Sequence, residues 1–335
     1  MQMRVLGSTG LLVSKLCMGA WTFGKDKFGL GGLDAGQSKA IVDRALDAGI
    51  NFFDTSNNYS FGQSEELLGA ALVGKREQVV VSTKVRSPTG EGPNDQGLSR
   101  HQLIRSVEQS LKRLQTDYID VLIIHGWDEL TPPLETLRAM DDLVRSGKVR
   151  YVGGSNLCAW QLAEFLAISE REGLPRFEIL QAYYNLVGRE LEHELIPLCE
   201  YKKVGIMTWS PLGNGYLTGK YRHGGKGRRD IPMFSNFPPM NLETGEKVID
   251  LLEVFAAEHQ ASCGAVALAW QMANPAITCP ILGAKNVEQL EQNLPAENLE
   301  LSAEELQQLN EVSAIPLPYP NWMVGFQNQP RLDAD

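Results

Sequence analysis

Cysteine and histidine are scarce in this sequence, and neither forms a metal-binding pattern. The five cysteines are widely spaced and odd in number, and none belongs to a C-x-x-C pair, which favours neither a disulfide framework nor a zinc ribbon. The segment E-H-E at 192–194 has no second histidine four residues from the first, so we expect no metal. The cysteines are Cys17, Cys158, Cys199, Cys263 and Cys279, and the histidines without ligand spacing are His101, His193, His223 and His259.

Basic residues and long apolar runs are also in short supply. The chain has 31 lysines and arginines against 41 aspartates and glutamates, which gives a net charge of −10. Such a chain lacks the positive field of a nucleic-acid-binding protein and suits an anionic membrane surface poorly. No apolar stretch approaches the ~18 residues that cross a bilayer, and the N-terminus has no long apolar signal region. We expect a cytoplasmic protein with no nucleic-acid or membrane partner.

Short apolar, β-branched segments alternate along the 335 residues with amphipathic segments of helical period. This alternation predicts an α/β fold with a parallel sheet, and eight such units favour a closed (β/α)8 TIM barrel over an open doubly wound sheet. We expect strands at 16–20, 50–54, 78–84, 119–125, 149–153, 178–182, 204–209 and 277–282. We expect helices at 39–48, 64–72, 99–113, 133–145, 159–167, 190–201, 244–258, 262–273, 287–293 and 303–312.

The rest of the chain fits a single barrel domain spanning residues 1–335. Residues 1–14 resemble a β-hairpin with G-S-T-G at 7–10 as its turn. A long irregular segment, 211–243, follows the seventh expected strand, and a proline-rich tail covers 314–335. The segment G-L-G-G-L-D at 29–34 has aspartate where a dinucleotide fingerprint needs its third glycine, so we interpret it as a flexible loop over the barrel mouth.

Polar residues stand where the expected strands end, which is where active sites lie in this type of barrel. Asp54, Lys84 and His125 end three successive apolar strands, and Tyr59 follows Asp54 by five residues. Taken singly, a structural Asp54–Lys84 ion pair and a buried histidine would be simpler interpretations. Their joint placement at one rim of the barrel favours a site instead.

These four side chains suit the reduction of a carbonyl group. A tyrosine hydroxyl is a weak acid at neutral pH, and a neighbouring Lys84 ammonium lowers its pKa. Asp54 can hold Lys84 in place, and His125 can donate a hydrogen bond to a carbonyl oxygen. The hydride must then come from a cofactor, because no side chain supplies one. A Schiff-base enzyme that uses a neutral Lys84 is an alternative.

Several motifs, taken in order, give the sequence a family resemblance over nearly its whole length. They are N-F-F-D-T-S-N-N-Y at 51–59, G-Q-S-E at 62–65, S-T-K at 82–84, I-I-H-G-W-D at 123–128, G-S-N at 154–156, Q-A-Y-Y-N at 181–185, W-S-P-L-G at 209–213, L-T-G-K-Y at 217–221 and I-L-G-A-K-N-V-E-Q-L-E-Q-N at 281–293. With these motifs the chain resembles the aldo-keto reductases. Its long segment after the seventh strand is similar to the branch that includes bacterial reductases and potassium-channel β subunits.

The resemblance implies a site that binds NADP(H), with Tyr59 as the general acid and Lys84, Asp54 and His125 completing a catalytic tetrad. It implies that the nicotinamide carboxamide is held by Ser155, Asn156 and Gln181, that Trp209 stacks on the nicotinamide, and that Trp21 and Asp54 also contact the cofactor. The pyrophosphate would be lined by Ser210, Pro211, Leu212, Gly213 and Lys220, and the adenosine end by Gly283, Lys285, Gln289, Gln292 and Asn293.

Two departures from the family pattern concern the adenosine end. Gln292 stands where the family often has glutamate, and Gly283-Ala284 stands where many members have Lys-Ser. Lys285 is then the nearest cation for the 2′-phosphate of NADP, with Arg228 or Arg229 as helpers. We expect NADP in preference to NAD.

The substrate side of the expected site is aromatic. Trp21 and Trp127 are expected to line the pocket, which suits apolar or ring-shaped carbonyl compounds. Asp128 is interpreted as a structural anchor of its loop. The sequence thus predicts an NADP-dependent oxidoreductase that reduces a small-molecule aldehyde or ketone to an alcohol, reversibly. A regulatory subunit that binds the cofactor with little turnover is the alternative.

Overall fold

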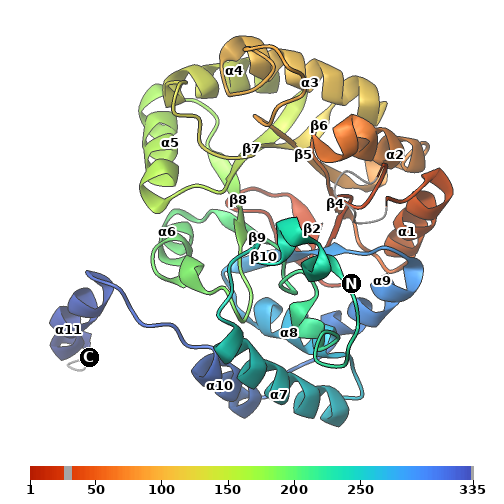
Figure 1. Cartoon of the computed structure of the whole chain (residues 1–335). Helices are drawn as coiled ribbons and strands as arrows, with labels where there is room; N and C mark the ends of the chain where they lie inside the picture. Colours follow the sequence, from red (N-terminus) through yellow and green to blue (C-terminus); the bar gives the residue numbers. More distant parts are fainter. Residues whose placement is uncertain (26–31, 333–335) are drawn as a thin grey trace.

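The eight main strands close into a parallel barrel in the computed structural model, which describes residues 1–25 and 32–332 and side chains up to residue 329. Around the barrel the order is β10-β3-β4-β5-β6-β7-β8-β9, and each neighbouring pair is parallel (Figure 1). The closed barrel is confirmed and the open sheet is wrong. The strands are β3 (Cys17–Gly19), β4 (Phe52–Asp54), β5 (Val80–Val85), β6 (Ile119–Ile124), β7 (Val149–Ser155), β8 (Phe177–Tyr183), β9 (Gly205–Trp209) and β10 (Ile277–Gly283).

Helices surround the barrel and bury their apolar faces against the strands (Figure 1). The helices that follow the strands are α1 (Ala35–Asp47), α2 (Gln63–Ala71), α3 (Arg100–Leu114), α4 (Pro133–Arg145), α5 (Ala159–Glu172), α6 (Leu195–Lys202), α7 (Leu242–Glu258), α8 (Cys263–Ala273) and α9 (Val287–Asn293). Two more follow near the C-terminus, α10 (Ala303–Val312) and α11 (Asn321–Leu332). None of the helices in the described ranges is both long and apolar enough to span a bilayer.

The N-terminal hairpin is confirmed, and it closes one end of the barrel. Strands β1 (Met3–Val5) and β2 (Leu12–Ser14) pair antiparallel around the expected turn. Leu6 and Val13 are fully buried in the same cluster as the inward-facing barrel residues Phe52 and Ile179. The hairpin therefore fills the end of the barrel at which the strands begin.

The first helix starts earlier than its apolar period predicts. Asp34 accepts a hydrogen bond from the backbone N–H of Gln37 (2.8 Å), and the Gln37 side chain accepts one from the Asp34 N–H (3.1 Å). This capping box satisfies two N–H groups at the helix start and allows α1 to begin at Ala35. Residues 32–34 thus lead into a helix instead of forming a flexible loop, while 29–31 lie outside the described residues.

The helix expected at 190–201 is divided in two by a proline. A short 3-10 turn, η3 (Glu190–Glu192), comes first, and α6 begins only at Leu195. In a continuous helix the ring of Pro197 would clash with the carbonyl of His193, and Pro197 has no N–H to donate to it. The His193 carbonyl instead accepts a hydrogen bond from Asn321 of α11 (2.5 Å). That helix lies in the expected proline-rich tail and stands away from the barrel (Figure 1).

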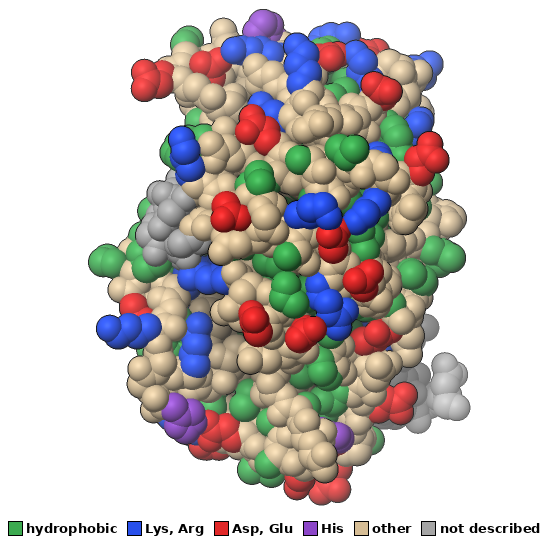
Figure 2. Space-filling view, turned by 90° about the vertical axis from the view of Figure 1, so that its right-hand side faces the viewer, with side chains coloured by type: hydrophobic (Ala, Val, Ile, Leu, Met, Phe, Trp, Pro, Cys, Tyr) green, Lys and Arg blue, Asp and Glu red, His purple; other side chains and the backbone are tan. Residues whose placement is uncertain are grey.

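The long segment expected at 211–243 is irregular up to residue 241, where α7 follows, apart from three short 3-10 turns, η4 (Tyr216–Thr218), η5 (Arg228–Asp230) and η6 (Pro232–Phe234). Arg222 fastens it to α7 through ion pairs with Glu246 (2.8 Å) and Asp250 (2.7 Å). Elsewhere on the surface, acidic and basic side chains are interspersed on the face shown in Figure 2.

Candidate active site

Asp54 and Lys84 form a fully satisfied ion pair inside the barrel. Lys84 is completely buried, and its Nζ donates to Asp54 Oδ2 (2.6 Å) and to the backbone carbonyl of Thr55 (2.7 Å). The other Asp54 oxygen accepts from Ser82 Oγ (2.7 Å) and Gln181 Nε2 (3.0 Å). Burial alone would lower the pKa of Lys84, but the charge of Asp54 and the nearby phenol raise it, so the amine is an ammonium ion.

Tyr59 lies beside this pair at the rim of the barrel. The Lys84 Nζ is 4.9 Å from the centre of the Tyr59 ring. The ring centre lies 5.9 Å from that of His125 and 6.1 Å from that of Trp21. The structure therefore brings together the four side chains that the sequence singles out, with Trp21 next to them.

The pKa of the Tyr59 phenol is raised overall. Burial has the largest effect and raises it, while the Lys84 ammonium lowers it and the Asp54 carboxylate raises it further. The sequence predicts the sign of the lysine's effect but not the larger effect of burial, which opposes it. At neutral pH the phenol keeps its proton.

The chain turns sharply after Tyr59. Ser60 and Phe61 have φ values of 47° and 58°, and Gly62 follows at 93°. The φ of Gly62 lies in the left-handed region that favours glycine, and a β-carbon there would also come within 2.9 Å of Cδ of Arg113, so the arginine side chain would have to shift. The left-handed turn carries the chain from Tyr59 directly into α2.

His125 is neutral. Burial, together with the charges of Lys84 and Arg86, lowers its pKa to about 3. Its Nδ1 lies 3.3 Å from both Ser56 Oγ and Ser87 Oγ. Ser56 already donates its proton to Asn58 Oδ1 (2.8 Å), so Ser87 is the hydroxyl that can donate to Nδ1. In that arrangement Nε2 carries the imidazole proton.

Because of this low pKa, we expect the free energy of unfolding to decrease as the pH is lowered. Between about pH 6.5 and about pH 3 the unfolded chain protonates His125 and the folded chain does not, so acid favours unfolding. Between pH 7.5 and pH 5 we expect this residue to cost about 2 kcal/mol of unfolding free energy. Urea unfolding of the natural chain and of His125→Gln gives the free energy of unfolding at both pH values. The change between the two pH values should be larger in the natural chain, and the excess is the contribution of His125. Equal pH dependence in the two proteins would contradict the assignment.

Polar side chains at the ends of β7 and β8 lie next to the four residues. Ser155 Oγ is buried with no hydrogen-bond partner in the described part of the chain. The Asn156 amide donates to the His125 carbonyl (3.1 Å) and accepts from Trp209 Nε1 (3.1 Å). Gln181 is held by Asp54. A buried hydroxyl without a partner, between two amide side chains, fits the polar end of a carboxamide-bearing ligand.

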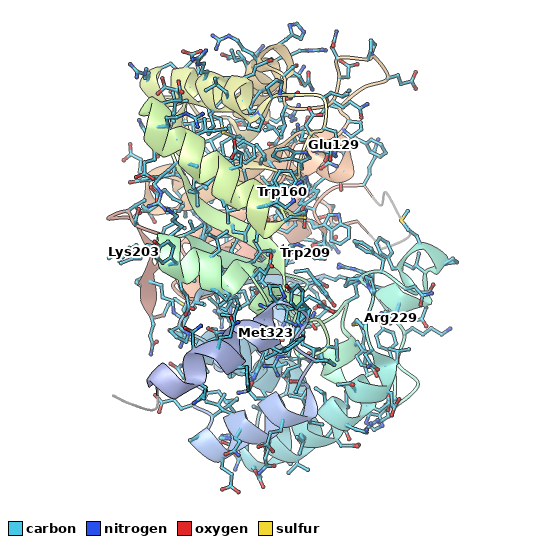
Figure 3. The ribbon with its side chains drawn as sticks, turned by 90° about the vertical axis from the view of Figure 1, so that its left-hand side faces the viewer. Glu129, Trp160, Lys203, Trp209, Arg229 and Met323 are labelled. Carbon is cyan, nitrogen blue, oxygen red and sulfur yellow. The ribbon has the colours of Figure 1, made fainter. Side chains whose placement is uncertain are left out.

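Two phenylalanines of the long segment complete an aromatic wall that the sequence analysis did not include. Phe234 packs edge-on against Trp21 (5.9 Å between ring centres), and Phe237 stacks on Trp209 (6.1 Å, 16° between planes). In Figure 3, Lys203, which comes just before β9, lies on the side where the strands begin, while Trp209, the last residue of β9, lies toward the side that carries Arg229. The F-S-N-F-P pattern at 234–238, apolar residues in a polar segment, is the signal that could have revealed them.

Trp127 packs its ring mainly against α5. Its ring centre is 5.3 Å from that of Trp160 and 5.6 Å from that of Phe165. Asp128 anchors the same loop by accepting hydrogen bonds from the Leu98 N–H (2.7 Å) and the Thr131 hydroxyl (2.7 Å), which fits its expected structural role. The place of Trp127 in a substrate pocket stays a prediction.

Three cations gather beside the aromatic wall. Burial has the largest effect on Lys220 and lowers its pKa, and the neighbouring charges of Lys285 and Arg228 lower this pKa further. The Arg228 guanidinium lies 4.4 Å over the Trp21 ring and donates to Asn214 Oδ1 (3.1 Å). The charge of Arg228 also lowers the pKa of Tyr59, so this arginine is close enough to affect the phenol.

Arg229, the other expected helper, stabilises the long segment itself. It lies over the Tyr216 ring (5.7 Å) and donates to the carbonyl of Ser235 (2.6 Å).

The residues expected at the adenosine end lie between the end of β10 and the end of α9. Gln289 Oε1 accepts from the Lys285 N–H (2.9 Å), and Ser262 Oγ donates to the Gln292 carbonyl (2.9 Å). Gly283 faces open space, and Asn293 is buried. The Gln289 side chain thus ties the backbone at Lys285 to the first turn of α9.

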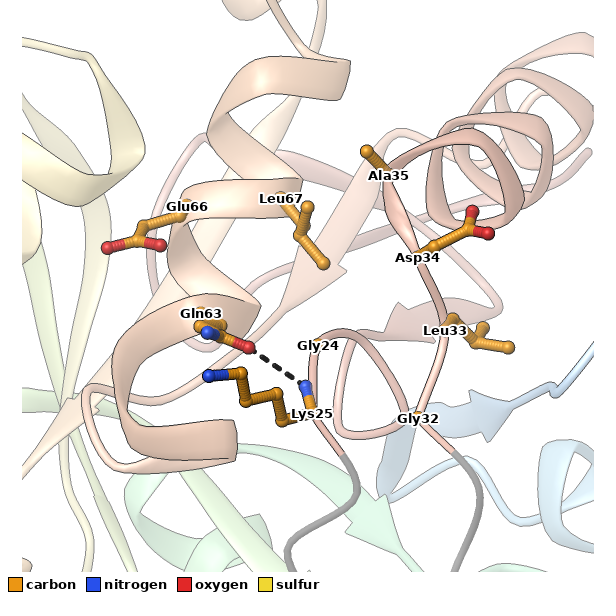
Figure 4. A pocket seen from close by; sticks show the side chains of 9 residues that line it. All are labelled: Gly24, Lys25, Gly32, Leu33, Asp34, Ala35, Gln63, Glu66 and Leu67. Atoms are coloured by element: carbon orange, nitrogen blue, oxygen red, sulfur yellow. Dashed lines mark hydrogen bonds between the residues drawn. The ribbon is translucent and has the colours of Figure 1, made fainter.

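A separate cavity of about 530 Å³ lies between α2 and the start of α1 (Figure 4). None of its lining residues belongs to the group around Tyr59. They are Gly24, Lys25, Gly32, Leu33, Asp34, Ala35, Gln63, Glu66 and Leu67.

The sequence is similar to known proteins over most of its length. The model of the aldo/keto reductase family matches residues 15–314. A Bacillus subtilis protein named uncharacterized oxidoreductase YrpG is 39% identical over 324 residues, 93% of this chain and 96% of that protein. A probable voltage-gated potassium channel subunit beta of Oryza sativa subsp. japonica is 38% identical over 310 residues, 88% of this chain and 91% of that protein.

A versiconal hemiacetal acetate reductase of Aspergillus parasiticus is 33% identical over 328 residues, 91% of this chain and 95% of that protein. The family model spans most of the chain, and these relatives cover about nine-tenths of it. The chain therefore belongs to the aldo/keto reductase family and is an oxidoreductase.

Proposed function

We propose that this protein reduces an aldehyde or ketone to an alcohol with NADPH, in a reversible reaction. The observation that carries the proposal is the buried Lys84 ammonium, held by Asp54 and the Thr55 carbonyl beside the protonated Tyr59 phenol. A phenol beside a fixed positive charge can give up its proton and be stabilised as the anion.

Each of the four side chains has a distinct part in this reaction. The carbonyl oxygen of the substrate binds between Tyr59 and the Nε2–H of neutral His125. When bound, the nicotinamide supplies the hydride that adds to the carbonyl carbon. The oxygen takes its proton from Tyr59, and Lys84 stabilises the phenolate that remains. Asp54 keeps Lys84 charged and in place.

The residues around this centre fit a dinucleotide with several phosphate groups. Lys220, Arg228 and Lys285 supply a concentration of positive charge that suits the pyrophosphate and the 2′-phosphate. The free hydroxyl of Ser155 and the amides of Asn156 and Gln181 suit the carboxamide, and Trp209 offers a ring to the nicotinamide. NADP is proposed over NAD because Lys285 provides a charge at the adenosine end.

Lys285→Ala tests the choice of cofactor. Loss of a charge-assisted contact with the 2′-phosphate is expected to raise the Kd for NADPH about tenfold and to change the Kd for NADH less than about twofold. Fluorescence titration with both cofactors measures this. Lys226→Ala, which removes an exposed lysine of the long segment, is the control and should change neither value. An equal change in both affinities would contradict the assignment of Lys285.

A carbonyl screen tests the reaction itself. The wall formed by Trp21, Phe234 and Phe237 suits ring-bearing substrates, so aromatic aldehydes should be reduced with lower KM than short aliphatic ones. The measurement is NADPH consumption with a panel of aldehydes and ketones.

A second candidate function is a regulatory subunit that binds the cofactor. It is supported by the relative named as a potassium channel subunit beta. Tight NADPH binding without consumption by any member of the panel would favour it.

A Schiff-base mechanism needs a neutral lysine, and the raised pKa of Lys84 opposes it.

A further inference from the structure

The segment G-Q-S-E at 62–65 contains the first residues of α2 and has no part in the proposed reaction. Its side chains form hydrogen bonds with the elements around Tyr59. Gln63 Oε1 accepts from the Lys25 N–H (2.9 Å), as Figure 4 shows. Glu65, fully buried, accepts from the hydroxyl of Thr83, the residue before Lys84 (2.5 Å), and from Arg113 of α3 (2.7 Å). Ser64, between Gln63 and Glu65 in the sequence, contacts Thr55, the residue after Asp54.

The direction of the hydrogen bonds at Ser64 follows from proton counting. Ser64 Oγ lies 2.6 Å from the Ala20 carbonyl, which can only accept, so the Ser64 proton goes there. Ser64 Oγ also lies 2.8 Å from Thr55 Oγ1, and the proton in that contact must come from Thr55. Both hydroxyl groups are fully buried. Ser64 is therefore the acceptor that fixes the side chain of Thr55.

Thr55 in turn directs the Lys84 ammonium. An ammonium group has three protons, and here one goes to Asp54 and one to the Thr55 carbonyl. The third is the one available to the Tyr59 hydroxyl, and a Lys84–Tyr59 hydrogen bond contributes to the pKa of both groups. A shift of the Thr55 peptide would rotate the ammonium and redirect that proton.

We propose that Ser64 is a positioning residue that aims the Lys84 ammonium at Tyr59 by fixing Thr55. This inference rests on the proposed function of Tyr59 as proton donor. Ser64 does not contact the substrate. It acts through the hydrogen bond from the Thr55 hydroxyl, the Thr55 peptide group, and the hydrogen bond from Lys84 to the Thr55 carbonyl. Other charged or titratable groups around the ammonium and the phenol lie on several elements: Cys17 on β3, Asp54 on β4, His125 after β6 and Arg228 on the long segment.

Ser64→Ala is expected to lower kcat about tenfold with little change in KM or in the Kd of the cofactor. It should also move the pH profile. Reduction needs the protonated phenol, so activity falls at high pH as Tyr59 ionises. A less well aimed ammonium stabilises the phenolate less, so the alkaline limb should move to higher pH.

Matched variants separate positioning from general loss of stability. Ser169→Ala removes another buried helix hydroxyl, whose single proton is shared between the Phe165 (2.9 Å) and Pro175 (3.0 Å) carbonyls away from the site, and should leave the pH profile unchanged. Thr55→Val should reproduce the effect of Ser64→Ala, and Thr55→Ser should retain natural behaviour. Because both residues act through one hydrogen bond, the Ser64→Ala/Thr55→Val double variant should be no slower than either single variant.

An unchanged pH profile in Ser64→Ala, or additive losses in the double variant, would overturn the positioning role. Ultraviolet difference titration of Tyr59, identified by its loss in Tyr59→Phe, reports the same pKa without any turnover. If Tyr59→Phe reduces carbonyl compounds normally, the proposed function fails. If Tyr59→Phe is inactive and the titration of Tyr59 is the same with and without the Ser64 hydroxyl, only the role of Ser64 fails.

Discussion

Replacing Tyr59 with phenylalanine is expected to lower kcat for carbonyl reduction by about 10²–10⁴-fold, the usual contribution of a positioned proton donor. The substitution removes one oxygen and keeps the ring, which packs edge-on against His125 and lies over the Lys84 ammonium. Folding and cofactor affinity should therefore change little. Steady-state kinetics, with a titration of NADPH, measure both quantities.

The control for this prediction is a tyrosine outside the site. Tyr118 is flanked by the guanidinium groups of Arg76 (4.1 Å) and Arg150 (4.8 Å), so Tyr118→Phe keeps those contacts and should retain full activity. If Tyr59→Phe turned over at a rate comparable with Tyr118→Phe, another group would have to be the proton donor.

Lys84→Met is expected to have the largest effect on stability. It leaves the Asp54 carboxylate buried without its cation, a change that costs about 3–5 kcal/mol of unfolding free energy in comparable buried pairs. Carbonyl reduction should also be lost, because no positive charge remains to stabilise the phenolate. Chemical unfolding at pH 7 and the kinetic assay measure the two effects on the same preparation.

A second substitution distinguishes the two roles of Lys84. Asp54→Asn combined with Lys84→Met removes both charges, and should recover part of the lost stability but none of the activity. Lys148→Met breaks a half-exposed pair with Glu108 instead, and should cost less than about 1 kcal/mol. A loss in Lys84→Met no greater than in Lys148→Met would show that the buried pair contributes little to folding.

The barrel and the group around Tyr59 could be foreseen because both depend on local patterns. Buried parallel strands are recognisable as apolar runs, and a parallel barrel necessarily brings their ends to one rim. Asp54, Lys84 and His125 each end such a run, so their proximity follows from the topology. The hairpin was predictable because G-S-T-G is flanked by short β-forming segments.

The features that could not be foreseen depend on contacts between distant segments or on competing effects. Asp34 caps α1 only because Gln37 returns the hydrogen bond, and the helix start depends on that pair. For Tyr59, the opposing effects of burial and of Lys84 on the pKa can be compared only once the depth of the phenol is known. Phe234 and Phe237 reach the barrel mouth through an irregular segment whose path no periodicity describes.

The N-terminal hairpin leaves the barrel accessible from one side. Leu6 and Val13 fill the space beneath the inward-facing strand residues, so in the part of the chain that the structure describes the barrel is closed at the end where its strands begin, and Tyr59 lies at the other rim beside Trp21. Under the proposed function, reactants and products use that same rim, and their order of arrival and departure becomes part of the kinetics. Tags or fusion partners joined at Met1 would lie at the end of the barrel that the hairpin closes, away from the rim beside Tyr59.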